Sequence, residues 1–335
     1  MTKVAHSPAP VSPWISRWLY LVAAMIFTTL IVGGATRLTK SGLSITEWQP
    51  IMGTLPPLSQ ADWQDAFAKY QQSSQYKLMN QGMTLEDFKF IFWWEWGHRL
   101  LDRVIGFVFL LPFLFFAATG RIARSLWPRL ALIFVAGGLE GLVGWYMVKS
   151  GLVDRVSVSQ YRLAAHLCLA TLLYAAVLWT ALSIGNIRRR QLGANGWLAL
   201  AFAGGIVLQM GAGAFVAGLD AGQGYNTWPL MDGALVPSGL FAMSPVWANL
   251  FENALTVQFD HRMLAYVLAV LGLWIALRRP GWPARLVGIA VIAQISLGIA
   301  TLLLHVPLML ALAHQGGALV LLTAALLNLH AETSR

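Results

Sequence analysis

The sequence predicts an all-α membrane protein that crosses the bilayer eight times. Of its 335 residues, 57% are hydrophobic and only 11% are charged, whereas a soluble domain carries about 25% charged residues. Its mean hydropathy is +0.62, and eight separate apolar runs each reach the length of about 20 residues that a membrane-spanning helix needs. The net charge of +9 does not indicate nucleic-acid binding, because most basic residues lie in short loops between the apolar runs, where they orient helices.

The apolar runs give the order of the predicted spans. They lie at roughly 17–36, 97–118, 128–148, 163–184, 196–218, 258–277, 283–304 and 307–328. The first run is long enough to stay in the membrane, and no cleavable signal or Arg/Ser-rich transit segment precedes it, which favours a bacterial chain. The single cysteine, Cys168, lies within the fourth run, so the sequence predicts neither a disulfide framework nor a cysteine-based metal cluster.

Clusters of arginine set the orientation of these spans. Three internal loops are basic, while no Lys or Arg occurs between Arg190 and Arg262. Because positive loops stay on the cytoplasmic side, we expect a protein of the bacterial cytoplasmic (inner) membrane with both termini in the cytoplasm. The clusters are Arg121, Arg124 and Arg129; Arg188, Arg189 and Arg190; and Arg278, Arg279 and Arg285.

The long segment after the first span, about residues 38–96, is predicted to contain short helices. Ser59 with Asp62, and Thr84 with Asp87, have the spacing of helix N-caps. The second of these helices runs into Phe92-Trp-Trp, an aromatic density typical of a membrane interface. We therefore expect the loops after the first and fifth spans to lie as lids on the outer surface.

The chain repeats itself at a constant offset of 180 residues. The segment 33–57 after the first span matches the segment 213–237 after the fifth in its glycines, a tryptophan, a leucine and a proline, without gaps. Each half has an even number of spans, so the two repeats are parallel rather than inverted. The sequence predicts two tandem four-helix bundles with pseudo-two-fold symmetry about the membrane normal, residues 1–190 and residues 191–335.

Four histidines occupy matching places in the two halves, early in even-numbered spans. His98 and His261 open similar phrases, and His166 and His314 follow in the last span of each half. Ionisable residues at membrane depth are costly and indicate function, and two imidazoles facing across a bundle can hold a heme iron axially. Alternatively, each histidine only hydrogen-bonds a neighbouring helix. The topology places both candidate sites towards the outer leaflet.

One residue breaks the equivalence of the two halves. Glu95 lies three residues before His98 and shares its helix face, but the matching residue in the second half is Gln258. A carboxyl group at one site and an amide at the other indicates proton-coupled chemistry in the first half alone, with Glu95 as acid or base. The alternative is an interfacial glutamate paired with Arg99. A di-iron site would need further glutamates, which are absent.

Further candidates flank the histidines. Arg99 and Arg262 directly follow His98 and His261, and a guanidinium suits the propionates of a heme, although an arginine can also reach the interface from there without a ligand. Glu140 lies inside the third span, where an acid is expensive. It and its counterpart Gln294 are candidates to support a histidine, or Glu140 is a neutral acid that bridges helices.

Three long motifs are similar to one known family. The runs Phe92-Trp-Trp-Glu-Trp-Gly-His-Arg99, Gly144-Trp-Tyr-Met-Val-Lys-Ser-Gly151 and Gly33-Gly-Ala-Thr-Arg-Leu-Thr-Lys-Ser-Gly-Leu-Ser44 resemble heme A synthase. The class is the one found in proteobacteria and mitochondria, which lacks cysteine pairs in its outer loops. The similarity extends from the first span to the eighth.

This resemblance implies an oxidoreductase that converts heme O to heme A by successive hydroxylation of a porphyrin methyl group to a formyl group, for cytochrome c oxidase biogenesis. In the family, the first half holds the substrate heme and the second half holds a heme b. Carried over by motif, His98 and His166 face the substrate iron, His261 and His314 ligate heme b, and Glu95 matches the essential glutamate.

The expected partners follow from the same resemblance. They are the lipid bilayer, the heme O substrate, the farnesyltransferase that makes it, and assembly factors of cytochrome c oxidase, but no nucleic acid. Exposed small-residue faces also allow a homo-oligomer. Two alternatives remain open at this point: a two-heme electron-transfer cytochrome b that modifies nothing, and a heme carrier or exporter.

Overall fold

The computed structural model describes residues 13–47, 52–153, 156–184 and 192–334. In these residues it contains helices and no strand, and eight helices are long and apolar enough to cross a membrane. They are α1 (Pro13–Leu38), α4 (Leu85–Ala118), α5 (Trp127–Val153), α6 (Gln160–Ser183), α7 (Ala194–Gly218), α9 (Ala254–Arg278), α10 (Trp282–Leu303) and α11 (Leu308–Ser334). The prediction of an all-α, multi-pass membrane protein with eight spans is confirmed.

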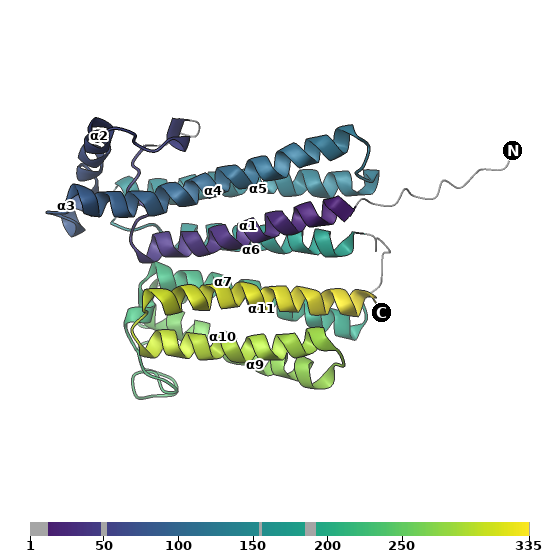
Figure 1. Ribbon diagram of the computed structural model, residues 1–335. Helices are drawn as coiled ribbons and strands as arrows, with labels where there is room; N and C mark the ends of the chain where they lie inside the picture. The colour runs from purple at the N-terminus through teal and green to yellow at the C-terminus, as the bar shows by residue number, and fades with distance from the viewer. Residues whose placement is uncertain (1–12, 48–51, 154–155, 185–191, 335) are drawn as a thin grey trace.

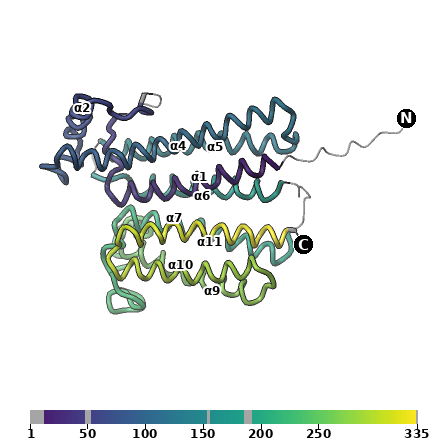
Figure 2. Tube along the Cα trace, in the orientation of Figure 1, coloured from purple at the N-terminus to yellow at the C-terminus, as the bar shows by residue number. Residues whose placement is uncertain are grey.

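The spanning helices contact one another in two rings of four. In the first group α1 packs against α4 and α6, and α5 also packs against both. In the second group α7 packs against α9 and α11, and α10 also packs against both. Figures 1 and 2 show the groups one above the other, joined by contacts of α6 with α7 and of α1 and α6 with α11. The pseudo-two-fold relation stays a prediction, and its boundary at residue 190, with Arg188, Arg189 and Arg190, lies outside the described residues.

The core runs through both groups without a break. Fully buried side chains come from α1, α5, α6, α7 and α11, among them Leu19, Leu130, Val177, Phe202 and Leu322. Large apolar side chains on the outer faces stay exposed, as expected where lipid is the solvent. Helices in lipid gain little from apolar burial and associate by close packing instead, so glycines at the crossings matter for the sites described below.

Helix α4 joins two elements that the sequence predicted separately, the helix capped at Thr84 and the second span. The expected span started at residue 97, but the helix runs from Leu85 without a break. Thr84 caps it, with its hydroxyl accepting from Asp87 N–H and the Asp87 carboxylate accepting from Thr84 N–H. No Pro interrupts the chain between this cap and the span, so the capped helix and the span form one element. Glu95 and His98 therefore lie on a continuous helix, well beyond its first turn.

The remaining helices are short and connect the spans. They are α2 (Gln60–Gln71), α3 (Ser74–Met79), α8 (Asn249–Glu252) and the 3-10 turns Met52–Thr54, Arg124–Leu126, Ala221–Gln223 and Val246–Ala248. Helix α2 has the predicted Ser59–Asp62 capping box, and its N–H and hydroxyl donors hold the pKa of Asp62 below its usual value. Trp63 and Tyr70 of α2 pack against Phe88 of α4. In Figure 1, α2 and α3 lie at the end of the bundle opposite the C-terminus.

Candidate paired histidine sites

Each of the four histidines packs against a glycine of the preceding span. A Cβ atom placed on that glycine would lie 2.9 Å from His98, 2.8 Å from His166, 3.2 Å from His261 and 2.8 Å from His314, measured to the ring Cε1 atom. The glycines are, in the same order, Gly33, Gly144, Gly213 and Gly298. At Gly33, Gly144 and Gly298 a Cβ atom would force the imidazole to move, and at Gly213 the contact would be tight. The sequence showed that these glycines match between the two halves, but it did not predict that each one contacts a histidine ring.

The two histidines of each predicted pair lie in the same helix group. Glu140 is close enough to interact electrostatically with both His98 and His166, and His261 interacts in the same way with His314. Each pair comes from two helices of one group: α4 and α6 in the first, α9 and α11 in the second. We call these the first and the second histidine pair.

A polar side chain one turn before the glycine contacts the histidine in three of four cases. Glu140 Oε1 lies 2.9 Å from His166 Nδ1. Gln294 Nε2 lies 3.2 Å from His314 Nδ1 and donates to the His314 main-chain oxygen at 2.9 Å. Gln209 Nε2 makes the same contacts with His261, at 3.1 Å and 2.9 Å. The predicted roles of Glu140 and Gln294 beside a histidine fit this geometry, whereas Gln209 was missed because it lies singly in an apolar run.

His98 is the exception. Its Nδ1 atom is buried without a hydrogen bond, and its Nε2 atom lies 3.8 Å from Oδ2 of Asp102, one turn further along α4. The other carboxylate oxygen of Asp102 accepts a hydrogen bond from Thr29 of α1 at 3.1 Å. Sequence reasoning missed Asp102. The signal was its place opposite Ala265, inside the same matched phrase that revealed the histidines.

Glu95 is buried, and both of its carboxylate oxygens are bound. Oε2 accepts from the Ser44 hydroxyl and from Ile45 N–H, each at 2.7 Å. Oε1 lies 2.5 Å from Arg99 Nη2, in the ion pair that the sequence had left as an alternative. Arg99 also donates to the main-chain oxygen of Ile45. Glu95 and Arg99 together hold the chain that leaves α1.

Gln258 occupies the matching place with the opposite hydrogen-bond polarity. Its amide nitrogen donates to the main-chain oxygens of Ala221, at 2.7 Å, and Gly224, at 3.0 Å. Its oxygen accepts from Arg262, at 2.8 Å. The loop beside Glu95 presents a main-chain N–H donor to it, whereas the loop beside Gln258 presents main-chain oxygen acceptors. The backbone around each residue therefore matches a carboxylate at position 95 and an amide at position 258.

At two matching positions the first histidine pair has an acid where the second has an amide: Glu95 matches Gln258 and Glu140 matches Gln294. Glu95, Asp102 and Glu140 surround the first pair, and Gln209, Gln258 and Gln294 surround the second. Among the described residues no three His, Cys, Asp or Glu side chains are placed to hold a bare metal ion. His166 and His314, one from each pair, are contacted at Nδ1, whereas Nε2 of His98 lies 3.8 Å from Asp102 and Nε2 of His261 lies 3.3 Å from Gln209. A pair of imidazoles with few other protein ligands suits a heme, whose porphyrin supplies the remaining ligands.

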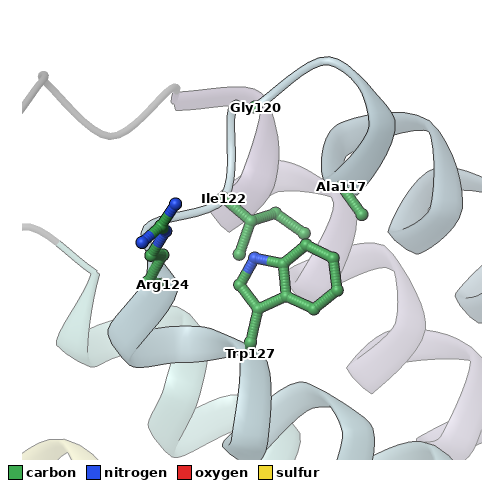
Figure 3. Close-up of a pocket in the computed structure, with 5 residues that line it drawn as sticks. All are labelled: Ala117, Gly120, Ile122, Arg124 and Trp127. Carbon is green, nitrogen blue, oxygen red and sulfur yellow. The ribbon is translucent and has the colours of Figure 1, made fainter.

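One surface cavity lies away from these residues. It measures about 470 Å³ and is lined by Ala117, Gly120, Ile122, Arg124 and Trp127. Figure 3 shows the lining side chains, which come from the end of α4, the turn after it and the start of α5. At 1.5 Å per helical residue, Ala117 lies about 30 Å from His98 along α4, so this cavity has no part in the histidine sites.

Comparison with known proteins matches nearly the whole chain. The family model COX15-CtaA, described as cytochrome oxidase assembly protein, matches residues 16–326. A protein named heme A synthase from Azorhizobium caulinodans is 55% identical over 333 residues, which cover 97% of this chain and 94% of the relative. Proteins of the same name from Parvibaculum lavamentivorans (94% of this chain, 93% of the relative) and Chelativorans (95% and 94%) are 52% and 50% identical.

Proposed function

The chain belongs to the COX15-CtaA family of cytochrome oxidase assembly proteins, and from this premise we propose a role for each histidine pair. The protein is a membrane oxidoreductase that converts heme O to heme A for cytochrome oxidase. A plain electron-transfer cytochrome and a heme carrier, the two alternatives that the sequence left open, are not favoured by this membership. The assignment of residues to the reaction is our proposal.

The first pair holds the substrate. His98 and His166 face the iron of heme O, within the half formed by residues 1–190. The observation that carries this assignment is the distribution of acids: the buried Glu95 and the partly buried Glu140 lie at this pair, and the amides of Gln258 and Gln294 lie at the other. Oxidising a methyl group removes protons as well as electrons, and carboxylates can accept protons where amides cannot.

Glu95 is the proposed catalytic group. It lies one helical turn from His98 and is held by Ser44, Ile45 and Arg99. Fixed donors keep both oxygens in one orientation, which is how a site prepares a group for use without reorganising during the reaction. The bound heme supplies the redox chemistry at its iron. The chain supplies the orientation, the buried surroundings and the carboxylate.

The second pair holds a resident heme b. His261 and His314, in the half formed by residues 191–335, are its proposed axial ligands, supported by Gln209 and Gln294. The side chains that contact these two rings in the described part of the chain are amides, so this pair suits electron transfer to the first site. Arg99 and Arg262 are proposed to contact propionates in addition to the protein groups that they bind.

The proposed location is the bacterial inner membrane, with both termini cytoplasmic and both sites towards the outer side. The basic residues at the α4–α5 and α9–α10 connections support this orientation. The proposed partners are heme O, the farnesyltransferase that produces it and assembly factors of the oxidase. A homo-oligomer through small-residue helix faces is a further proposal.

Mass analysis of the heme extracted from purified protein tests this function. We expect heme O together with its alcohol, its hydrated or free aldehyde, and unmodified heme b. Two chemically unchanged hemes b would instead identify an electron-transfer cytochrome. Intact heme O that leaves the protein without any oxidised product would identify a carrier.

A further inference from the structure

A groove between α5 and α6 continues from the first histidine pair towards the other end of the bundle. Its volume is about 300 Å³. Ala136, at one end, lies one helical turn before Glu140 on α5, and Leu169 lies one turn after His166 on α6. Because Glu140 contacts His166, the groove starts next to the proposed substrate site and runs along the same faces of both helices.

The groove is apolar over most of its length and opens to the outside of the bundle. Ile133 and Leu173, which line it, are buried, whereas the lining residues Leu132 and Leu172 are exposed and form its rims. On α6 it extends over residues 169–180, about 16 Å at 1.5 Å per helical residue. A long, narrow apolar groove of this kind suits a single hydrocarbon chain.

The matching positions are closed in the second helix group. Ala136 and Ala176 line the groove and are partly exposed. Counted from the matched acid and amide and from the matched histidines, their counterparts are Ala290 and Ala324, which are only 7% and 0% exposed. Helix α10 also packs more extensively against α11 than α5 does against α6. Since all four residues are alanines, the helix packing and not the side-chain size opens the groove in the first group.

The two hemes differ in the same way as the two helix groups. Heme O carries the farnesyl chain that the farnesyltransferase adds, and heme b lacks it. Two axial histidines hold an iron on one axis, but they do not stop the porphyrin from rotating about that axis. A reaction at one particular methyl group needs that rotation to be fixed, because the reacting atoms must be held in place. A chain bound along a groove would fix it.

We propose that the groove between α5 and α6 binds the farnesyl chain of heme O and so determines which methyl group of the porphyrin is oxidised. This inference rests on the proposed function. A hydrocarbon chain that leaves lipid for such a groove gains little from the hydrophobic effect and is held by close packing instead. A side chain that fills the groove should therefore displace it.

The test compares two hemes at the first histidine pair. Purified protein with heme b at the second pair is titrated with heme O and, separately, with further heme b. The dissociation constants are taken from the absorption change that His166→Ala abolishes. Ala176→Phe places a ring in the groove, about 15 Å along α6 from His166. We expect heme O to bind about tenfold more weakly to this variant, while heme b binds to the first pair as before. Ala131→Phe, on an exposed part of α5 that does not line the groove, is the control and should change neither constant.

Unchanged heme O affinity in Ala176→Phe, or an equal loss for both hemes, overturns the inference. If that variant loses the spectrum of the resident heme b and thus its fold, cross-linking at the rim of the groove decides. The photoreactive residue p-benzoylphenylalanine in place of Leu132 should couple to heme O on illumination. In place of Val135, which is similarly exposed (65% against 68%) but does not line the groove, it should not. Coupling at both positions, or at neither, contradicts the proposal.

Two other results have separate meanings. Arg129 lies at the far end of the groove and could bind the phosphate of a phospholipid. If position 132 still couples to a phospholipid after heme O has bound, the groove is a lipid site and the inference fails. Absence of heme O binding at the first pair in the unaltered protein would overturn the proposed function instead.

Discussion

Arg37 donates a hydrogen bond from Nη2 to the main-chain oxygen of Ala217 at 2.6 Å, and Ala217 stands 180 positions later in the chain. That separation equals the offset at which segment 33–57 repeats as segment 213–237. The bond thus joins the end of α1 to the corresponding point near the end of α7. A second contact, from Arg37 to Asp220 at 3.0 Å, strengthens the tie.

Replacing Arg37 should weaken the joint between the two helix groups. Arg37→Met keeps the apolar stem but loses both contacts. Hydrogen bonds from charged groups contribute about 1.5–3 kcal/mol, and we expect a destabilisation of about that size, measured as thermal unfolding in detergent. Asp220→Asn is the control: the ion pair is partly exposed, so its loss should cost about 1 kcal/mol or less. Equal effects of the two variants would show that the bond to Ala217 contributes nothing.

Replacing Glu95 should stop the reaction and spare the fold. In Glu95→Gln the side chain keeps its size, and Gln258 shows that an amide with an arginine partner is accommodated at the matching place. The new NH2 group must face a donor, either Ile45 N–H or Arg99, so some stability is lost, about 1–3 kcal/mol. We expect the heme b spectrum to persist and formyl formation to cease, as judged by mass analysis of extracted heme. Normal production of heme A in this variant would remove Glu95 from the catalytic role.

Much of this architecture could be predicted from the sequence, because membrane spans and helix caps are local patterns. The eight spans, the caps at Ser59 and Thr84 and the pairing of the histidines all follow from runs, spacings and the repeat. The continuity of α4 was missed because hydropathy marks only where a helix enters lipid, whereas this helix begins at the predicted cap at Thr84 and continues into the span.

The parts that escaped prediction depend on contacts between helices. Gln209 contacts His261 on another helix, and Asp102 lies near His98, one turn away on the same helix. No pattern in the adjacent sequence predicts either contact. The two halves were compared for residues that they share. Asp102 was missed because its counterpart in the second half, Ala265, is a different residue. The sequence could not decide whether Glu95 and Arg99 form an ion pair. Their i,i+4 spacing on a helix permits the contact, but it does not determine the side-chain rotamers.

Removing the second histidine pair should remove the resident heme. His261→Ala and His314→Ala each delete one proposed axial ligand, and the low-spin b-type absorption spectrum should disappear in both. His98→Ala and His166→Ala are the matched controls, and they should keep that spectrum while losing heme O. Retention of the low-spin spectrum in both His261→Ala and His314→Ala would refute the assignment of heme b to this pair.

Replacing a glycine that contacts a histidine with alanine should disturb heme binding at that histidine pair and not at the other. In Gly298→Ala the new Cβ would lie 2.8 Å from the His314 ring, closer than such atoms can approach. The ring cannot yield easily, because Gln294 holds it from the neighbouring helix. We therefore expect a shifted or lost heme b spectrum with heme O binding retained.

The matched change in the first half should give the opposite result. Gly144→Ala would meet the His166 ring, also at 2.8 Å, and should weaken heme O binding while the heme b spectrum is preserved. Gly141→Ala, one turn earlier on α5, is the control because a Cβ there meets nothing within 4 Å. Since alanine is favoured over glycine in helices by about 1 kcal/mol, that control should be neutral or slightly stabilising. If Gly141→Ala and Gly144→Ala behaved alike in heme O binding, the close packing of His166 on Gly144 would not be what shapes the site.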